Sequence, residues 1–164
     1  MKVSAVIYKN VKGEGEKKKD KSYEEIMAEI AMRVGKRLEL PSDLPKGEWA
    51  DQALKVLRER YLDKDENGEI KETPEGLVWR VAFAIASAEV RWGADKGQVI
   101  EMARRFYKLM VSMKFLPNSP TLMNAGKGNG LQYSACFVLP VEDSLVGIFD
   151  AVKWLALVQQ RGGG

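Results

Sequence analysis

One stretch of the chain, residues 74–92, is apolar on most of its sides and constrains the fold more than any other. It begins with helix-start signals, because Thr73 can cap it, Pro74 suits its first position and Glu75 favours the helix dipole. Its most apolar part, residues 81–88, is too short to span a bilayer. A helix that is apolar nearly all round must be covered by other elements, so the sequence predicts a central buried helix.

Three further segments carry apolar residues at helical spacing and are predicted to pack around this helix. The first lies between Ser22, a potential cap, and Pro41; the second covers about residues 49–62. The third begins at Asp95 and Gln98, which have capping-box spacing. The apolar stripes are Tyr23, Ile26, Met27, Ile30, Val34 and Leu38 in the first, Trp49, Ala53, Val56, Leu57 and Tyr61 in the second, and Val99, Ala103, Phe106, Tyr107 and Met110 in the third.

The pattern changes in the last third of the chain. Prolines and asparagines over residues 117–124 predict an irregular loop, and residues 133–141 are rich in β formers, which predicts a buried strand. Asp143 or Ser144 can then cap a last helix. The apolar residues of that helix that we expect to face inward are Leu145, Ile148, Phe149, Val152 and Leu155.

The sequence therefore divides into three predicted parts. Residues 1–21 contain the charge run GEGEKKKDK and are predicted to be a solvated, mobile tail. A nucleic-acid-binding tail is the alternative, but three acidic residues dilute its charge. Residues 22–113 are predicted to form a helical domain, and residues 114–164 the first loop–strand–helix unit of an α/β fold. The fold class of this chain is mainly α.

Composition excludes several functional classes. The net charge of +3, from 26 Lys+Arg against 23 Asp+Glu, is too balanced to indicate nucleic-acid binding. The chain has no histidine, which excludes Ser–His and Cys–His pairs and histidine zinc sites within it. Its one cysteine cannot form an internal disulfide. With no signal peptide and no membrane span, we expect a cytoplasmic protein without membrane partners.

The turn after the second predicted helix resembles a calcium loop. Asp63, Asp65, Asn67 and Gly68 occupy calcium-loop positions, but Pro74 stands where the bidentate glutamate should be. We therefore interpret this segment as a polar turn.

Three features near the end of the chain have both a structural and a functional interpretation. Cys136 can be a small buried hydrophobe, but it also lies in a strand between a loop and a capped helix, where α/β folds bind ligands. Asp143 can be an N-cap or bind a ligand hydroxyl. The final glycines, residues 162–164, can be a flexible tail or a loop whose N–H groups approach a ligand closely.

Four segments taken together resemble the large subunit of ribonucleotide reductases, and are closest to the adenosylcobalamin-dependent class II branch. These are ETPEGLVWRVAFAIASAE, FLPNSPTLMNAG, SACFVLPVEDSLVGIFDAVK and the final GGG. The resemblance covers residues 49–164 and leaves residues 1–45 unmatched. It implies a helical domain followed by a ten-stranded α/β barrel. It also implies reduction of a ribonucleotide to a deoxyribonucleotide by a thiyl radical, with adenosylcobalamin as cofactor and a cysteine pair that becomes a disulfide.

The resemblance assigns roles to seven residues. Cys136 matches one member of the reducing pair, Thr121 a residue that hydrogen-bonds substrate, and Gly164 a glycine whose backbone lines the substrate. Ala135 matches a substrate-contacting position where other members have serine. The start of the specificity site, which binds a deoxynucleotide triphosphate effector, is matched by Asp143, Ser144 and Leu145. The implied partners are a thioredoxin-like or dithiol reductant and, for the complete enzyme, a second subunit in a homodimer.

Other family motifs are missing from the chain, among them the radical cysteine. We therefore expect an N-terminal part of a reductase that is inactive alone and needs the remainder of the reductase chain. An intein junction and a truncation explain the missing motifs equally well. The sequence also does not decide between class II and class I, or between a diphosphate and a triphosphate substrate. The alternative from a different class is a self-contained helical binding or regulatory module over residues 22–113, in which Cys136 belongs to the core.

Overall fold

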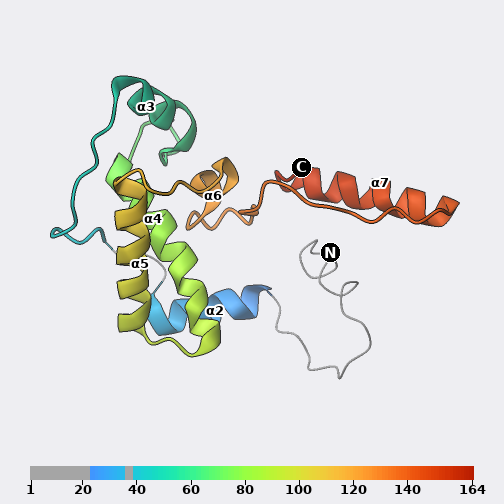
Figure 1. The fold of residues 1–164 in the computed structure, drawn as a ribbon, viewed down its shortest axis with the longest axis horizontal. Helices are drawn as coiled ribbons and strands as arrows, with labels where there is room; N and C mark the ends of the chain where they lie inside the picture. The colour runs from blue at the N-terminus through green and yellow to red at the C-terminus, as the bar shows by residue number, and fades with distance from the viewer. Residues whose placement is uncertain (1–22, 36–38) are drawn as a thin grey trace.

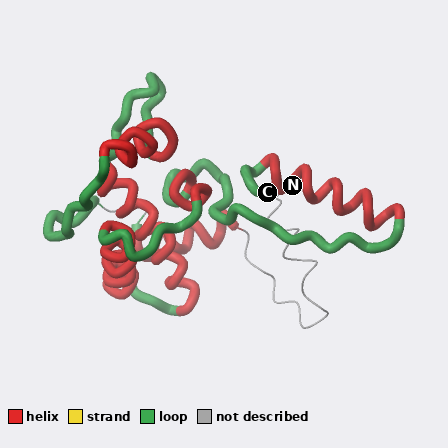
Figure 2. Tube along the Cα trace, turned by 45° about the horizontal axis from the view of Figure 1, so that its top comes forward, coloured by secondary structure: helices red, strands yellow, loops and turns green. Residues whose placement is uncertain are grey.

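A computed structural model describes residues 23–35 and 39–164 of the protein. These residues form helices joined by loops (Figures 1 and 2). The α-helices are α2 (Tyr23–Val34), α3 (Asp51–Val56), α4 (Pro74–Ala86), α5 (Lys96–Val111), α6 (Ser119–Asn124) and α7 (Leu145–Gln160), with a π-helix η1 (Leu57–Tyr61) and a 3-10 helix η2 (Ser87–Trp92). None of the described helices has the length and apolarity needed to cross a membrane. The tail predicted for residues 1–21 lies outside the described residues.

Helix α4 is the centre of the fold, and α5 lies beside it along its length (Figure 1). Its buried residues are Leu77, Val78, Trp79, Arg80, Val81, Ala82, Phe83 and Ala86. Trp79 packs edge-on against Tyr107 of α5, with 6.3 Å between ring centroids. Helix α2 packs against η2 and α5 and buries Val34 completely. The predicted central buried helix is confirmed.

The local signals that start these helices act as predicted. Thr73 Oγ1 accepts a hydrogen bond from Gly76 N at 3.0 Å and caps α4. Asp95 and Gln98 form a reciprocal capping box at the start of α5, with both bonds 2.9 Å long. At the end of α4, the Ser87 hydroxyl donates to the carbonyl of Phe83, and the helix tightens into η2 there. The predicted helix over residues 74–92 is therefore two consecutive helical segments.

The second predicted helix is also present, as α3 continued by η1, but its apolar face is covered only in part. Ala53, Leu57 and Tyr61 are half-buried, whereas Val56 is 43% exposed. Neither α3 nor η1 contains a fully buried residue, because this pair of segments lies at the rim of the body (Figure 1).

A polar cluster fastens the segment before α3 to the core. The carboxylate of Glu75 accepts hydrogen bonds from Trp49 Nε1 at 2.8 Å and from Gly47 N at 3.1 Å. Burial alone would raise the pKa of Glu75, but these donors together lower it. The hydroxyl of Tyr107 donates to Pro45 O at 2.8 Å. Burial, with the charge of Glu75 as a second cause, raises the pKa of Tyr107 to about 12.

The irregular loop predicted for residues 117–124 is wrong, because this segment contains the short helix α6. The Asn118 side chain accepts from Thr121 N at 3.2 Å and caps the helix, and Pro120 lies in its first turn. Asparagine and proline disrupt helix interiors but are favoured at these first positions. Leu122 and Ala125 join the same core as α4 and α5. The domain boundary at residue 113 stays a prediction.

The strand predicted for residues 133–141 does not form. The described chain there is extended, but it lacks the continuous ladder of hydrogen bonds that defines a strand. Its exposure alternates as in a strand, with Ala135, Phe137 and Leu139 half-buried and Val138 98% exposed. A strand requires a neighbouring strand along its length, and this segment instead runs beside α7 (Figures 1 and 2).

The inward orientation predicted for α7 is also wrong. Ser144 caps the helix as one of the two predicted candidates, with Gly147 N donating to its Oγ at 3.0 Å. The apolar side chains predicted to face inward are exposed: Leu145 77%, Ile148 43%, Phe149 69%, Val152 56% and Leu155 44%. The helix lies away from the α4–α5 pair, so these side chains have no covering element among the described residues (Figure 1). We call residues 131–164 the C-terminal arm, and residues 23–35 and 39–130 the helical body.

Candidate functional site

Three of the predicted substrate-contacting residues lie together in the C-terminal arm. Gly164 N donates to Ala135 O, and Phe137 N donates to Gly164 O, both at 2.7 Å. These two bonds flank Cys136, as in one step of a parallel β-ladder. The thiol of Cys136 is free and exposed. The backbone of Gly164 therefore lies directly beside the cysteine, although the two are separated by the whole of α7.

The three final glycines form a hydrogen-bonded turn that makes this approach possible. Gly162 has a φ of 81° and ends α7, with its N–H donating to Gln159 O at 2.9 Å. Gly163 N donates to Val158 O at 3.1 Å, which completes a Schellman-type helix end. A Cβ at Gly163 would lie 2.7–2.8 Å from the side chains of Gln132, Phe137 and Val158. The final glycines thus adopt a hydrogen-bonded turn that packs closely against the chain, and their predicted approach to a ligand stays a prediction.

Thr121 lies in α6 and is tied to the same arm. Its side chain is buried, and its hydroxyl lies 2.8 Å from Tyr133 O and also contacts Asn118 Oδ1. The single hydroxyl proton can serve only one of these acceptors at a time. Tyr133 precedes Ala135 by two residues, so Thr121 is coupled to the segment that carries the cysteine. Its predicted hydrogen bond to substrate stays a prediction.

The predicted effector residues lie at the other end of α7. Asp143, Ser144 and Leu145 are all exposed, and Ser144 rather than Asp143 is the cap. A helix of 16 residues is about 24 Å long, so this end is well separated from Gly164. The structure therefore forms two separate groups from the predicted site residues rather than one cluster.

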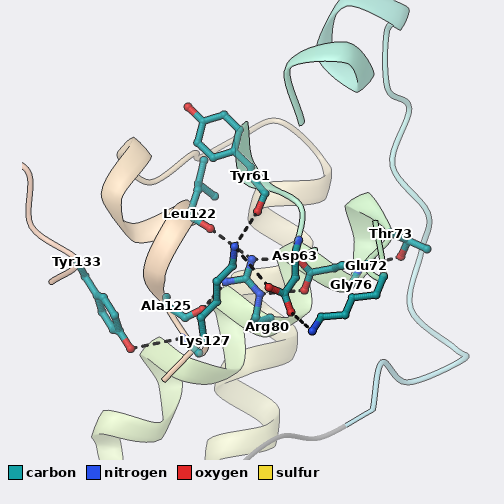
Figure 3. A network of polar contacts seen from close by, with 12 residues as sticks. Tyr61, Asp63, Glu72, Thr73, Gly76, Arg80, Leu122, Ala125, Lys127 and Tyr133 are labelled. Atoms are coloured by element: carbon teal, nitrogen blue, oxygen red, sulfur yellow. Dashed lines mark hydrogen bonds and ion pairs between the residues drawn. The ribbon is translucent and has the colours of Figure 1, made fainter. Parts of the chain in front are cut away.

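A buried ion pair between Arg80 and Glu72 was not predicted from the sequence (Figure 3). The two side chains are 2% and 1% exposed. Arg80 Nε donates to Glu72 Oε1 at 2.9 Å, and Nη2 donates to Oε2 at 3.0 Å. The guanidinium also donates to the carbonyls of Ala125 and Leu122 at the end of α6. An arginine within an otherwise apolar helix was the available signal, since a buried charge needs a partner.

Lys127 adds a second cation to this network. Its Nζ lies 3.8 Å from Asp63 Oδ1 and donates to Tyr61 O at 3.4 Å (Figure 3). Burial and the neighbouring Arg80 lower the pKa of Lys127, against the opposing effect of Asp63 and Glu72. The loop after α6 is thus fastened to α4 through Arg80 and to residues 61–63 through Lys127.

Neither of two hollows on the helical body is suited to hold a corrin cofactor beside the predicted site residues. Two hollows have volumes of about 500 and 290 Å³, and both lie on the helical body, lined by residues of α3–η1 and of η2–α5. Neither hollow includes a predicted site residue, and Cys136 lies exposed on an extended segment. Within the part of the chain that the structure describes, no group of three or more His, Cys, Asp or Glu side chains is placed to hold a metal.

Comparison with known proteins identifies the helical body. The family described as "Ribonucleotide reductase, all-alpha domain" matches residues 47–130, which is half of the chain. This chain belongs to the ribonucleotide reductase family. The match runs from the segment before α3 to the loop after α6, so it covers the Arg80 network and Thr121. The resemblance seen in the sequence is therefore confirmed, as is the mainly α class.

Individual reductases show the same relationship. The chain is 46% identical over 112 residues to the vitamin B12-dependent ribonucleoside-diphosphate reductase of Mycobacterium tuberculosis (strain CDC 1551 / Oshkosh), and 36% identical over 165 residues to that of Thermoplasma acidophilum. Each comparison covers 68% of this chain, but only 16% and 21% of the relatives. The ribonucleoside-diphosphate reductase large subunit of Dictyostelium discoideum is 34% identical over 138 residues, covering 83% of this chain and 14% of that protein. The chain thus spans about a fifth or less of the length of these reductases.

Proposed function

We propose that this chain supplies the helical domain and one wall of the substrate site of a B12-dependent ribonucleoside-diphosphate reductase. The observation that carries this proposal is the pair of 2.7 Å hydrogen bonds that hold Gly164 against Ala135 and Phe137 around an exposed cysteine. The relatives named as B12-dependent diphosphate reductases support the choice of cofactor and substrate.

Cys136 is the proposed reductant at this site. Two thiols give up two electrons and two protons as they become a disulfide, while the ribose 2′-hydroxyl leaves as water and is replaced by hydrogen. A dithiol protein or small dithiol then restores the pair by exchange. Because the chain has one cysteine, the second thiol must come from the remainder of the reductase, with its Cα about 4.4–6.8 Å away. The chain alone is therefore expected to be inactive.

The other proposed contacts are made by backbone and hydroxyl groups. The Gly164 backbone and the peptide of Ala135 line the substrate, and the Thr121 hydroxyl binds it by exchanging one of its internal acceptors for a substrate oxygen. Adenosylcobalamin supplies the radical in such an enzyme, and the described residues contribute no site for it.

The far end of α7 is the proposed effector site. Asp143 can accept a hydrogen bond from the ribose hydroxyl of a deoxynucleotide triphosphate, and the start of a 16-residue helix offers N–H groups to anions. In the complete reductase, we propose that the arm forms the first part of a ten-stranded α/β barrel, that Gly164 continues the parallel ladder, and that the enzyme is a homodimer.

The test is turnover of the reductase assembled from this chain and its remainder, with adenosylcobalamin and a dithiol. Cys136→Ser should abolish multiple turnover because the disulfide cannot form, whereas Ser134→Ala, an exposed neighbour, should leave turnover unchanged. The 164-residue chain alone should form no deoxynucleotide. Full multiple turnover in the Cys136→Ser enzyme would remove the proposed redox role.

A second candidate is a self-contained helical binding module. It is favoured by the core itself, whose buried residues run from Val34 to Ala125 without any contribution from α7. If the assembled enzyme tolerated loss of both Cys136 and Thr121, this candidate would be preferred.

A further inference from the structure

We propose that Arg80 and Glu72 are positioning residues for the substrate site. They hold the segment 119–127, which carries Thr121, at a fixed position relative to the segment 133–136, which carries the cysteine. This inference rests on the proposed function for its consequence in catalysis, but its structural part can be tested separately.

The guanidinium of Arg80 joins an anion to the end of a helix. One edge binds both oxygens of Glu72, and the remaining N–H groups reach Leu122 O at 3.4 Å and Ala125 O. The last carbonyls of a helix have no partner within it, so α6 depends on an outside donor at this end. The planar fork of arginine can serve a carboxylate and two carbonyls together, whereas a lysine ammonium cannot reproduce that geometry.

Glu72 fixes the orientation of this fork. Its Oε2 also accepts from Asp63 N at 3.1 Å, which ties the carboxylate to the turn between η1 and α4. A buried charge that loses its partner is strongly unfavourable, so the two side chains constrain each other. Glu72 therefore holds the guanidinium in the orientation in which it contacts the end of α6.

Gly126 gives independent support for this close approach. Its φ is 76°, and a Cβ there would lie 2.7 Å from Arg80 Cγ and 3.2 Å from Arg80 O. The loop after α6 thus rests on the stem of Arg80, at a distance that only glycine allows. Gly126 N also donates to the Tyr133 hydroxyl at 3.4 Å, so the same residue contacts the start of the arm.

Tyr133 completes the path to the cysteine. Its hydroxyl is bound by Gly126 and its carbonyl lies 2.8 Å from the Thr121 hydroxyl, so both ends of this residue are fastened to the segment that Arg80 holds. Cys136 follows three residues later. Release of Arg80 should therefore loosen α6 and residues 133–136 together.

The first experiment measures amide hydrogen exchange in the 164-residue chain. Arg80→Lys keeps the charge but loses the fork, and should speed exchange by about tenfold or more at the hydrogen-bonded amides of residues 121–127 and at the Phe137 amide. Exchange in the middle of α5 should change much less. The matched control is Arg105→Lys, because Arg105 forms an exposed pair with Glu101 on α5 and should alter neither segment.

If Arg80→Lys unfolds the chain, Gly126→Ala carries the same test. This variant keeps both charged groups but forces the loop and the Arg80 side chain apart, so the same two segments should exchange faster. Unchanged exchange in these segments, or equal acceleration everywhere including α5, overturns the positioning role.

The second experiment measures kinetics of the assembled reductase. Arg80→Lys should raise KM for the ribonucleotide by about tenfold with a smaller change in kcat, because contacts made equally in the ground and transition states are lost. Thr121→Ala separates the two hypotheses. If it leaves KM unchanged, Thr121 does not bind substrate and that part of the proposed function fails, while the exchange result still decides the positioning role.

Discussion

The helical body and the C-terminal arm contain similar apolar side chains, but the body buries a large set of them, whereas the described arm fully buries only Val158. Leu77 and Val81 in α4 are 2% and 1% exposed, whereas Leu145 in α7 and Val138 beside it are 77% and 98% exposed. Each region forms a long helix, and both α4 and α7 have a hydroxyl cap. The difference shows that local signals are sufficient to start a helix, while burial depends on the surfaces available to cover it.

The largest expected effect on stability comes from truncating a leucine side chain, which we compare between the two regions. Leu77→Ala should lower the free energy of unfolding by about 2–5 kcal/mol, because it leaves a cavity in the core. Leu155→Ala, in the arm and 44% exposed, should cost less than about 1 kcal/mol. Denaturant unfolding of both variants measures this contrast. Equal losses would mean that the arm is covered in solution, for example by a second copy of the chain.

The second prediction concerns alkaline pH and sharpens the description of the body. Tyr107 has a pKa raised from about 10 to about 12, so the folded state holds its proton more tightly than the unfolded state. The contribution of the Tyr107 proton to the free energy of unfolding is fully present below pH 10. It should be lost as pH rises through 12, which lowers that free energy by about 2 kcal/mol. Unfolding free energies of the wild type and Tyr107→Phe across this window should converge. A constant difference between them would contradict the pKa assigned to Tyr107.

The smallest effect compares the two hydroxyl caps. Thr73→Ala should destabilise the whole body by about 1 kcal/mol, because α4 is its central helix. Ser144→Ala removes a cap of the same kind but should leave the main unfolding transition unchanged and reduce helicity in α7 only. Denaturation followed by Trp fluorescence, together with amide exchange in α7, distinguishes these outcomes. A shift of the main transition in Ser144→Ala would show that the arm and the body unfold together.

Much of the body could be predicted from sequence because its signals are local. Periodic apolar residues and the side chains of Thr73, Asp95 and Gln98 define α4 and α5 by short-range contacts. Helix α6 was missed because Asn118 and Pro120 are typical of both a loop and a helix start. Only the contacts of the next turn with the core decide between the two.

The arm and the buried ion pair depend on long-range contacts that sequence spacing does not encode. Residues 133–141 have the composition and alternation of a strand, but a ladder also requires a neighbour, and Gly164 provides only one step of it. The pairing of Arg80 with Glu72 and with the end of α6 joins three elements and has no periodic signature. Gly164 and the residues beside Cys136 are joined by a contact across all of α7, which sequence spacing does not predict, and their roles at a substrate site stay predictions.

The arm also contains a natural attachment point for spectroscopy. Cys136 is the chain's single cysteine, and it is exposed. A maleimide dye or a nitroxide can therefore be attached at one defined position without engineering the sequence. Energy transfer from the tryptophans, or the mobility of the spin label, would then follow the arm in real time as nucleotides or the rest of a reductase are added.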